Sequence, residues 1–497
     1  MWLNELLGGD FEAGMSSAEL NNIRISGITC DSSAVHEGYL FAAISGTQTD
    51  GRQFIPDALN RGAAAVLAPP GTLMDLSDAR VPLLLNKNPR RQYARMAARF
   101  YDKQPKKITC VTGTNGKTSV VSFLRQIWAA AGHRAASSGT LGVELSGYPD
   151  GLAPKLHYAS ALTTPDPADL HRSLAELSEN RIEYVGLEAS SHGLAQYRLD
   201  GVRPVAAAFT NLTRDHLDYH GDEKTYLAAK LRLFSEILVE HGSMIINADA
   251  PEADLLRVIA SKRQLRVIDY GVAAEDLVLM RSEVDGSGQK IELKLFGARY
   301  QVRFPLPGDF QVANALAALG LGVVTGVPIE TAVTAIADLK SIRGRLEYVT
   351  RHPSGAAIYV DYAHTPNALK NVLKTLKPHL DGDLHLVFGC GGDRDPGKRY
   401  EMGLVAASAA DHVVVTDDNP RSEDPAQIRR AIITGCPEAK EIQNRAEAIF
   451  TAVSALQPND ILIVAGKGHE VGQVINGQTL PFDDAEVIRR SVEGIMS

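Results

Sequence analysis

Seven short apolar runs, most of them followed by a polar or glycine-rich loop and a helical pattern, constrain the fold more than any other feature of this sequence. They are rich in Val, Ile and Leu, which is typical of buried parallel strands. The runs are 106–111, 182–188, 204–209, 356–360, 384–388, 412–415 and 460–464. This pattern predicts an α/β fold, and in such sheets ligands bind at the carboxyl ends of the strands.

The chain is too long for a single hydrophobic core, since 497 residues correspond to two to four domains of ordinary size. A polar, proline-containing stretch at 101–107 and a glycine after a helical run at 341–347 are the two clearest breaks. We therefore predict three domains, comprising residues 1–103, 104–341 and 342–497.

Composition excludes several classes of protein. Hydrophobic residues make up 44% and charged residues 22%, an ordinary globular balance, and the net charge of −8 disfavours a nucleic-acid binder. The four cysteines lie far apart without metal-binding spacing, which favours a reducing compartment. The sequence shows no signal-peptide pattern and no run of eighteen apolar residues. We expect a cytoplasmic protein that does not span a membrane.

The segment 111–118, VTGTNGKT, follows a predicted strand and opens a predicted helix. Glycines allow backbone N–H groups to converge on phosphate oxygens, and the helix amino terminus favours an anion. Lys117 would neutralise phosphate charge, and the Thr118 hydroxyl is suited to hold Mg²⁺. The segment predicts a phosphate-binding loop, although the spacing is two residues shorter than the commonest pattern. The alternative is a plain strand-to-helix turn.

Three further features permit more than one interpretation. Glu188 closes a predicted strand and either binds a cation or is a helix-capping or salt-bridged residue. The segment 211–220, rich in His and Asp, either holds a cation or acid–base groups or is a solvated loop. Lys230 falls on an otherwise apolar helical stripe, so it either extends its ammonium to solvent or is buried, with a lowered pKa or a chemical modification.

Together these motifs resemble the Mur ligases, the ATP-dependent amide-bond-forming enzymes of bacterial cell-wall precursor synthesis. The resemblance follows the chain in order through TGTNGKT, EASSHG, TNLTRDHLDYHG with AKLRLF, GDFQVANALAA, IRGRLE and VDYAHTP. It implies a central sheet of the P-loop type that binds a mononucleotide and a carboxy-terminal Rossmann-like domain, and a monomer is expected. Two more motifs, DNPR at 418–421 and GKGHE at 466–470, resemble the subset of the family that adds diaminopimelate.

The resemblance implies a reaction in which UDP-N-acetylmuramoyl-L-alanyl-D-glutamate, ATP and meso-diaminopimelate give the tripeptide product, ADP and phosphate through an acyl phosphate. The cofactor would be Mg²⁺, held by Thr118, Glu188, His216 and a carbamylated Lys230. The catalytic residues would be Lys117, Glu188, His216 and Lys230. ATP would be bound by Gly113, Thr114, Asn115, Gly116, Lys117, Thr118, Ser119, Asn314, Arg345 and Asp361. The UDP-muramoyl-dipeptide would be bound by Cys30, Ser32, Thr47, Gln48, Thr49, Thr163, Thr164, Ser190, Gln196 and Arg198.

Diaminopimelate differs from lysine in its distal end, which carries a carboxylate as well as an ammonium. The Arg421 guanidinium suits a carboxylate and would repel a lone ammonium, whereas Glu470 suits the ammonium. The diaminopimelate site would consist of Arg394, Asp418, Asn419, Pro420, Arg421, Gly466 and Glu470. The alternatives are a lysine-adding ligase of the same family, a folylpolyglutamate synthase-like ligase and a nucleotide-gated binding protein without amide chemistry.

Overall fold

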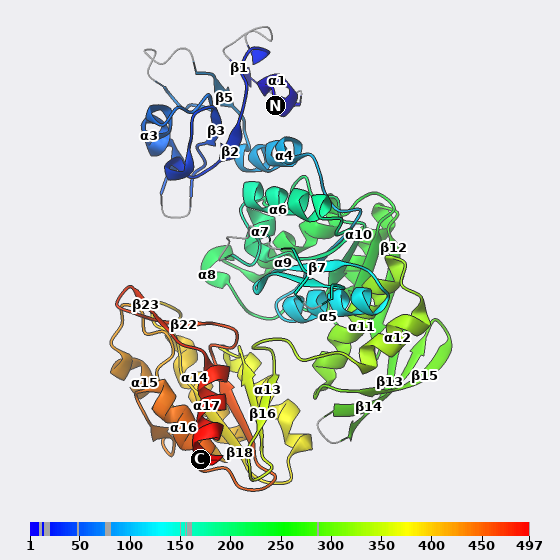
Figure 1. Ribbon diagram of the computed structural model, residues 1–497, viewed down its shortest axis with the longest axis vertical. Coiled ribbons are helices and arrows are strands. Elements are labelled where there is room, and N and C mark those ends of the chain that lie inside the picture. The colour runs from blue at the N-terminus through cyan, green and yellow to red at the C-terminus, as the bar shows by residue number, and fades with distance from the viewer. Residues whose placement is uncertain are drawn as a thin grey trace. The chain divides into compact units, whose positions relative to one another are not determined.

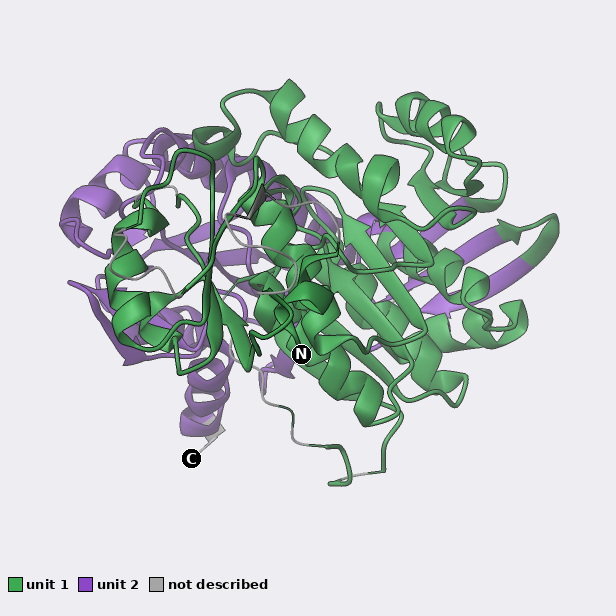
Figure 2. Cartoon of the chain, turned by 90° about the horizontal axis from the view of Figure 1, so that it is seen from above, with its two compact units in different colours: residues 1–279, 294–299, 314–336 green, residues 280–293, 300–313, 337–497 purple. Residues whose placement is uncertain are grey.

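The computed structural model describes residues 1–8, 12–13, 20–46, 49–74, 81–149, 151–154, 156, 162–285 and 288–496. The chain forms two compact units (Figure 2). Unit 1 comprises residues 1–279, 294–299 and 314–336, and unit 2 comprises residues 280–293, 300–313 and 337–497. The predicted three-domain boundaries remain a prediction.

The first sheet of unit 1 has the order β1-β5-β4-β3-β2, in which β1 is antiparallel and the other strands are parallel. Its strands are β1 (Glu12–Ala13), β2 (Gly27–Thr29), β3 (Tyr39–Ala42), β4 (Ala65–Ala68) and β5 (Leu83–Leu85). Its helices are α1 (Leu3–Leu7), η1 (Ser32–Ala34), η2 (Gly51–Phe54), α3 (Ile55–Asn60) and α4 (Pro89–Tyr101). Alternate residues of β3 enter the cores on opposite faces, Leu40 beside α1 and α4 and Phe41 beside α3.

The large sheet has the order β15-β14-β13-β12-β11-β10-β6-β9-β7-β8. Figure 1 labels its strands β7, β12, β13, β14 and β15. Strands β12, β11, β10, β6, β9 and β7 are mutually parallel, and β8 is antiparallel to β7. The strands are β6 (Lys107–Thr112), β7 (Ala135–Gly139), β8 (Gly142–Ser146), β9 (Tyr184–Glu188), β10 (Ala206–Phe209), β11 (Ser243–Asn247), β12 (Arg266–Gly271), β13 (Leu277–Asp285), β14 (Gly288–Leu295) and β15 (Ala298–Phe304).

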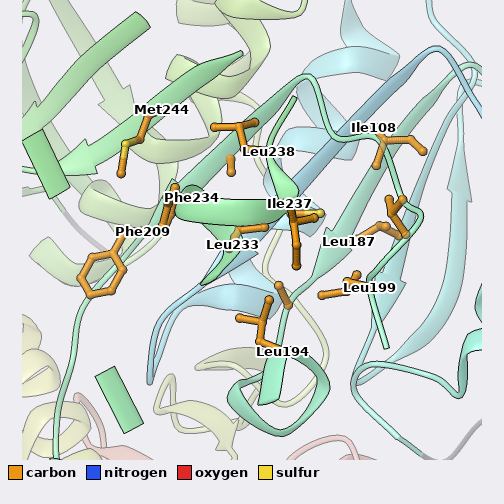
Figure 3. Close-up of a cluster of buried hydrophobic side chains, with 14 of the residues drawn as sticks. Ile108, Leu187, Leu194, Leu199, Phe209, Leu233, Phe234, Ile237, Leu238 and Met244 are labelled. Carbon is orange, nitrogen blue, oxygen red and sulfur yellow. The ribbon is translucent and has the colours of Figure 1, made fainter. Parts of the chain in front are cut away.

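Helices cover both faces of the parallel part of this sheet. The helices of this region are α5 (Lys117–Ala130), α6 (Pro167–Glu179), α7 (Ser191–Ala195), α8 (Leu217–His220), α9 (Glu223–Arg232), the π-helix η4 (Leu233–Ile237), α10 (Ala253–Lys262), α11 (Asp309–Val324) and α12 (Ile329–Ala337). One face carries the apolar cluster drawn in Figure 3, where Leu187, Phe209 and Met244 of the strands meet Leu194 and Phe234 of the helices. The opposite face is covered by α5 and α11.

The sheet of unit 2 has the order β16-β17-β21-β18-β19-β20 and is parallel except for β16. Its strands are β16 (Glu347–Arg351), β17 (Ala357–Asp361), β18 (Leu384–Phe388), β19 (His412–Val415), β20 (Lys440–Glu441) and β21 (Ile461–Ala465), beside the hairpin of β22 (Gly472–Ile475) and β23 (Gln478–Pro481). Its helices are α13 (Pro366–Leu376), η5 (Lys377–His379), α14 (Gly397–Ala409), α15 (Pro425–Ile433), α16 (Arg445–Ser454) and α17 (Asp484–Met496).

The two faces of this sheet carry separate cores. Side chains of α13, α14 and α15 pack on one face, and those of α16 and α17 pack on the other. This doubly covered parallel sheet confirms the predicted α/β class, and all seven apolar runs form parallel strands. Within the described residues, no helix has the length and apolar character needed to cross a membrane.

A fully buried ion pair joins α16 to α17 in unit 2. Arg445 Nε donates to Asp484 Oδ1 and Arg445 Nη2 donates to Asp484 Oδ2, both at 2.7 Å, and neither side chain is exposed. Arg445 Nη2 also donates to the Ala465 carbonyl at 3.0 Å. Removing one partner of such a pair leaves a buried charge uncompensated.

We expect Asp484→Asn to lower the free energy of unfolding by about 3–5 kcal/mol, because Arg445 would keep its charge without a counter-ion. Glu486→Gln is the matched control on the same helix, since Glu486 pairs with Arg490 at the surface. It should cost about 0–1 kcal/mol. Urea unfolding followed by circular dichroism measures both, and equal small effects would contradict the expectation.

Candidate active site

The predicted phosphate loop lies between the end of β6 and the start of α5. Gly113 has φ 149° and Gly116 has φ 86°, values that favour glycine. A Cβ at Gly113 would overlap Thr210 Oγ1, and a Cβ at Gly116 would overlap Asn314 Oδ1. The close packing of the loop against the end of β10 and against α11 therefore requires glycine at both positions.

Residues that follow β10 fix the conformation of the loop. The Thr114 N–H donates to the Asn211 carbonyl at 2.9 Å, and the Asn115 N–H donates to Asn211 Oδ1 at 3.0 Å. The Thr213 N–H donates to Thr114 Oγ1 at 2.9 Å. The start of the segment 211–220 therefore supports the phosphate loop, a role that its composition alone did not indicate.

Two lysine side chains converge on the same backbone carbonyl. Lys117 Nζ and Lys230 Nζ each donate to the Gly113 carbonyl at 2.8 Å. Lys230 is 1% exposed and lies 4.4 Å from the ring centre of Tyr226, so it is buried rather than extended to solvent. Burial, followed by the nearby Lys117 charge, lowers the pKa of Lys230 well below its ordinary value.

Glu188, the last residue of β9, is buried beside the start of the phosphate loop. It lies opposite Val111 of β6, and its two carboxylate oxygens accept from the Thr140 N–H at 2.9 Å and the Thr140 hydroxyl at 3.1 Å. A Cβ at Gly139 would overlap the carboxylate. Glu188 does not cap a helix, because Ser190 caps α7. Thr140 was not predicted from the sequence.

The predicted dipeptide-binding residues of the central region lie in one hydrogen-bond network. Thr164 Oγ1 accepts from the Ser190 N–H at 3.0 Å and donates to the Glu188 carbonyl at 2.9 Å. Arg198 donates to the Thr164 carbonyl and to Gln196 Oε1, both at 2.7 Å. Thr163 joins this network through its hydroxyl, 3.1 Å from that of Thr140.

His216 begins α8 with φ 54° and lies in a cluster of rings. Its ring centre is 4.8 Å from that of His192, a residue that the sequence did not single out. Burial, together with the nearby Lys117 charge, lowers the pKa of His216, while Asp215 raises it. The His216 imidazole is therefore neutral near pH 7 and available as a ligand.

The side chains near the predicted phosphate loop supply only part of a Mg²⁺ site. Thr118 and Glu188 offer the oxygen donors that Mg²⁺ prefers, beside a loop suited to phosphate. Among the residues described, however, no group of three or more His, Cys, Asp or Glu side chains is arranged to hold a metal. Any full coordination shell must therefore include phosphate oxygens, water or a modified side chain.

The predicted uridine-nucleotide residues are less fully described. Cys30 Sγ donates to Asp166 Oδ2 at 3.2 Å, and Tyr93 Oη donates to Asp166 Oδ1 at 2.7 Å. Ser32 begins η1, and the Thr49 carbonyl accepts from the Gly46 N–H at 2.7 Å. Thr47 and Gln48 lie outside the described residues.

The predicted nucleotide contacts are divided between the two units. Asn314 belongs to unit 1, whereas Arg345 and Asp361 belong to unit 2. In unit 2, Asp361 accepts from the Leu346 N–H at 2.6 Å and the Ala363 N–H at 2.7 Å, and burial raises the pKa of Asp361 to about 6. The Arg345 guanidinium lies 4.6 Å from the ring centre of Tyr362.

The predicted diaminopimelate residues gather at the carboxyl ends of β19 and β21 in unit 2. Asn419 Nδ2 donates to Glu470 Oε2 at 2.8 Å, and a Cβ at Gly466 would approach Asp418 Oδ2 to 2.6 Å. The buried Pro420 follows Asn419.

The two predicted arginines of this set lie on neighbouring loops. Arg421 has φ 52° and donates from Nη1 to the Gly392 carbonyl at 2.7 Å. Arg394, two residues beyond Gly392, is exposed. Lys467, buried beside Asn419 and Glu470, is a residue that the sequence analysis did not assign to the site.

A nucleotide-binding α/β fold with these strand-end clusters defines a class of ATP-dependent ligases, and comparison with known proteins agrees. The Mur ligase family, catalytic domain matches residues 24–101, the Mur ligase middle domain matches 111–322, and the Mur ligase, glutamate ligase domain matches 344–468. The chain belongs to the Mur ligase family.

Individual relatives span the full length of the chain. A UDP-N-acetylmuramoyl-L-alanyl-D-glutamate–2,6-diaminopimelate ligase from Brucella melitensis is 50% identical over 474 residues, covering 95% of each chain. A solved structure of an enzyme with the same name has a TM-score of 0.71 and 33% identity, covering 100% of this chain and 99% of its own. The fold also matches a MurF ligase from Thermotoga maritima in complex with ADP, with a TM-score of 0.63 and 17% identity. The match covers 97% of this chain and 99% of that ligase.

We expect Gly116→Ala to weaken ATP binding by at least about tenfold, because the new methyl group would displace Asn314 and the loop. Gly132→Ala is the matched control beyond the other end of α5. Its φ of 83° imposes the same backbone strain, but a Cβ there meets nothing within 4 Å. Isothermal titration calorimetry distinguishes the two, and equal affinities would contradict the steric argument.

Proposed function

We propose that this chain is the ATP-dependent ligase that joins meso-diaminopimelate to the D-glutamyl γ-carboxylate of UDP-N-acetylmuramoyl-L-alanyl-D-glutamate in peptidoglycan precursor synthesis. The observation that carries the proposal is the full-length similarity to ligases of that name, at 50% identity in the Brucella melitensis relative. The contact between Asn419 and Glu470 and the guanidinium of Arg421 on a neighbouring loop support the choice of amino acid.

Amide formation requires activation, because a carboxylate and an ammonium do not condense at a useful rate at neutral pH. In the proposed reaction the γ-carboxylate attacks the γ-phosphate of ATP and forms an acyl phosphate, with ADP as leaving group. The amine of diaminopimelate then attacks the acyl carbon and expels phosphate. Both steps concentrate negative charge, so fixed cationic and N–H groups accelerate them.

The residues of unit 1 supply these fixed groups. The loop from Gly113 to Ser119 directs backbone N–H groups and the amino terminus of α5 towards phosphate oxygens. Lys117, held against the loop carbonyls, supplies positive charge. Thr164, Ser190 and Arg198 of this unit orient the dipeptide, and Asn314 contacts the nucleotide.

Mg²⁺ would be held by Thr118 and Glu188, with His216 at a second ion, and when bound it neutralises phosphate charge. Thr140 orients the Glu188 carboxylate, because its N–H and hydroxyl donate to the two carboxylate oxygens. The neutral imidazole of His216 can also donate a lone pair to a metal.

Unit 2 supplies the recognition of the amino acid. Arg421, directed towards the loop at 391–392, offers a planar guanidinium to the distal carboxylate, and Arg394 offers a second cation. Glu470 accepts from the distal ammonium. Lysine would leave the Arg421 guanidinium without a carboxylate partner and close to a lone ammonium, which disfavours the lysine-adding alternative.

The state of the cysteines supports a location in a reducing compartment. All four cysteines are free thiols, three of them buried, as a reducing environment permits. We propose a cytoplasmic monomer in which residues 1–103 bind the uridine nucleotide, 104–341 bind ATP and 342–497 bind diaminopimelate.

Phosphate release in the presence of ATP, Mg²⁺ and UDP-muramoyl-dipeptide tests the reaction. We expect release to require diaminopimelate, with lysine supporting less than about a tenth of the rate, and mass spectrometry to show the tripeptide product. Equal rates with lysine would favour the lysine-adding ligase, and release with a folate substrate alone would favour the folylpolyglutamate synthase-like reaction.

Arg421→Ala should raise the KM for diaminopimelate at least about tenfold and leave the KM for ATP unchanged, because a charge-assisted contact to the carboxylate is lost. Arg430→Ala is the matched control, since Arg430 is exposed on α15 and only distantly paired with Asp424. Unchanged kinetics for diaminopimelate in Arg421→Ala would refute this role.

Lys230 has the properties of a lysine that reacts with CO₂. Its burial favours the neutral amine, which is the nucleophilic form, and the product is a carbamate with release of one proton. We expect ¹³C-bicarbonate to give a carbamate NMR signal in the wild type and in the control Lys224→Gln, whose lysine is exposed on the same helix. The signal should vanish in Lys230→Gln, and its absence from the wild type would contradict carbamylation.

A further inference from the structure

Lys467 lies at the centre of the amino-acid cluster of unit 2 without any exposure to solvent. Its Nζ donates to Asn419 Oδ1 and to Glu470 Oε2, both at 2.9 Å. Desolvating an ammonium costs several kcal/mol unless its hydrogen bonds compensate, so a buried lysine here must be held by these two partners. Both partners belong to the proposed diaminopimelate site.

Two glycines fix the backbone around Lys467. Gly466 has φ 114°, and a Cβ there would approach Asp418 Oδ2 to 2.6 Å. Gly468 has φ 56°, and a Cβ there would approach the Tyr362 Cβ to 2.8 Å. The Glu470 N–H donates to the Lys467 carbonyl at 3.0 Å and closes the turn. The Lys467 side chain therefore starts from a constrained backbone and is directed inward.

Lys467 determines which way the Asn419 amide faces. Asn419 Oδ1 accepts from Lys467 Nζ and from the Val474 N–H, both at 2.9 Å, so its Nδ2 is directed at Glu470 Oε2. Glu470 Oε2 thus receives two donors. Glu470 Oε1 makes no hydrogen bond with any described residue, and the side chain remains 30% exposed. Oε1 is therefore the oxygen that a ligand's ammonium can reach.

Lys467 also compensates the charge of Glu470. The Lys467 ammonium pairs with the Glu470 carboxylate at 2.9 Å. Without Lys467 this carboxylate would lose its paired cation, which favours a ligand that ends in an ammonium alone.

We propose that Lys467 is a positioning and specificity-determining residue of the amino-acid site. It orients Asn419 and Glu470, so that Glu470 Oε1 receives the distal ammonium, and it balances the charge that would otherwise attract lysine. This inference rests on the function proposed above. Lys467 acts through Asn419 and Glu470 and does not touch the reacting atoms.

The test compares Lys467→Met, Glu470→Gln and the double variant with the wild type in the tripeptide-forming assay. We expect Lys467→Met to raise the KM for diaminopimelate by about tenfold to a hundredfold, with unchanged KM values for ATP and the UDP-muramoyl-dipeptide. The preference in kcat/KM for diaminopimelate over lysine should fall. The double variant should have nearly the KM of Glu470→Gln alone, because Lys467 acts through that carboxylate.

Lys467→Gln provides a second variant that keeps a polar group at this buried position, and it should show the same selective rise in KM if Lys467→Met does not fold. An unchanged KM for diaminopimelate, additive effects in the double variant, or equal losses for all three substrates would each overturn the inference. A wild-type enzyme that forms no tripeptide from diaminopimelate would instead overturn the proposed function, so the two failures are distinguishable.

Discussion

The carbonyl of Gly113 accepts from two lysines, and the site of unit 1 depends on this arrangement. Lys117 reaches the carbonyl from the start of α5, whereas Lys230 reaches it from α9, more than a hundred residues later in the chain. Gly113 has φ 149°, and a Cβ there would overlap Thr210 Oγ1, so this position requires glycine. One backbone carbonyl therefore holds two lysine side chains from separate helices close together.

The proximity of these ammonium groups has a chemical consequence. In a buried environment, two like charges favour the neutral form of the less accessible group, and Lys230 is that group. A neutral, buried amine beside a phosphate loop is poorly suited to bind an anion but well suited to react with CO₂. Burial, and not the shared contact with the Gly113 carbonyl, distinguishes Lys230 from Lys117, and the roles proposed for the two lysines follow from that difference.

Unit 2 uses a similar arrangement with a different outcome. Lys467 is also buried beside glycines of positive φ, but its partners are Asn419 and a carboxylate rather than a second lysine. The ammonium therefore orients other side chains. In both units the burial of a lysine is coupled to a turn at a strand end, where backbone and side-chain acceptors converge.

The pattern of the sequence was enough to predict the α/β fold class, which the structure confirms, and it supplied the candidate site residues, which stay a prediction. The apolar runs predicted the parallel strands, because the composition of a strand is a property of neighbouring residues in the chain. The segment VTGTNGKT likewise predicted the loop, because its glycines and Lys117 lie within a few residues of one another. The roles of Asn211, Thr140 and Lys467 required the tertiary structure, because each depends on a partner from a separate strand or loop. The sequence left Lys230 either solvated or buried. Only the packing of α9 against Gly113 decided this, since burial depends on the whole fold and not on the pattern of one helix.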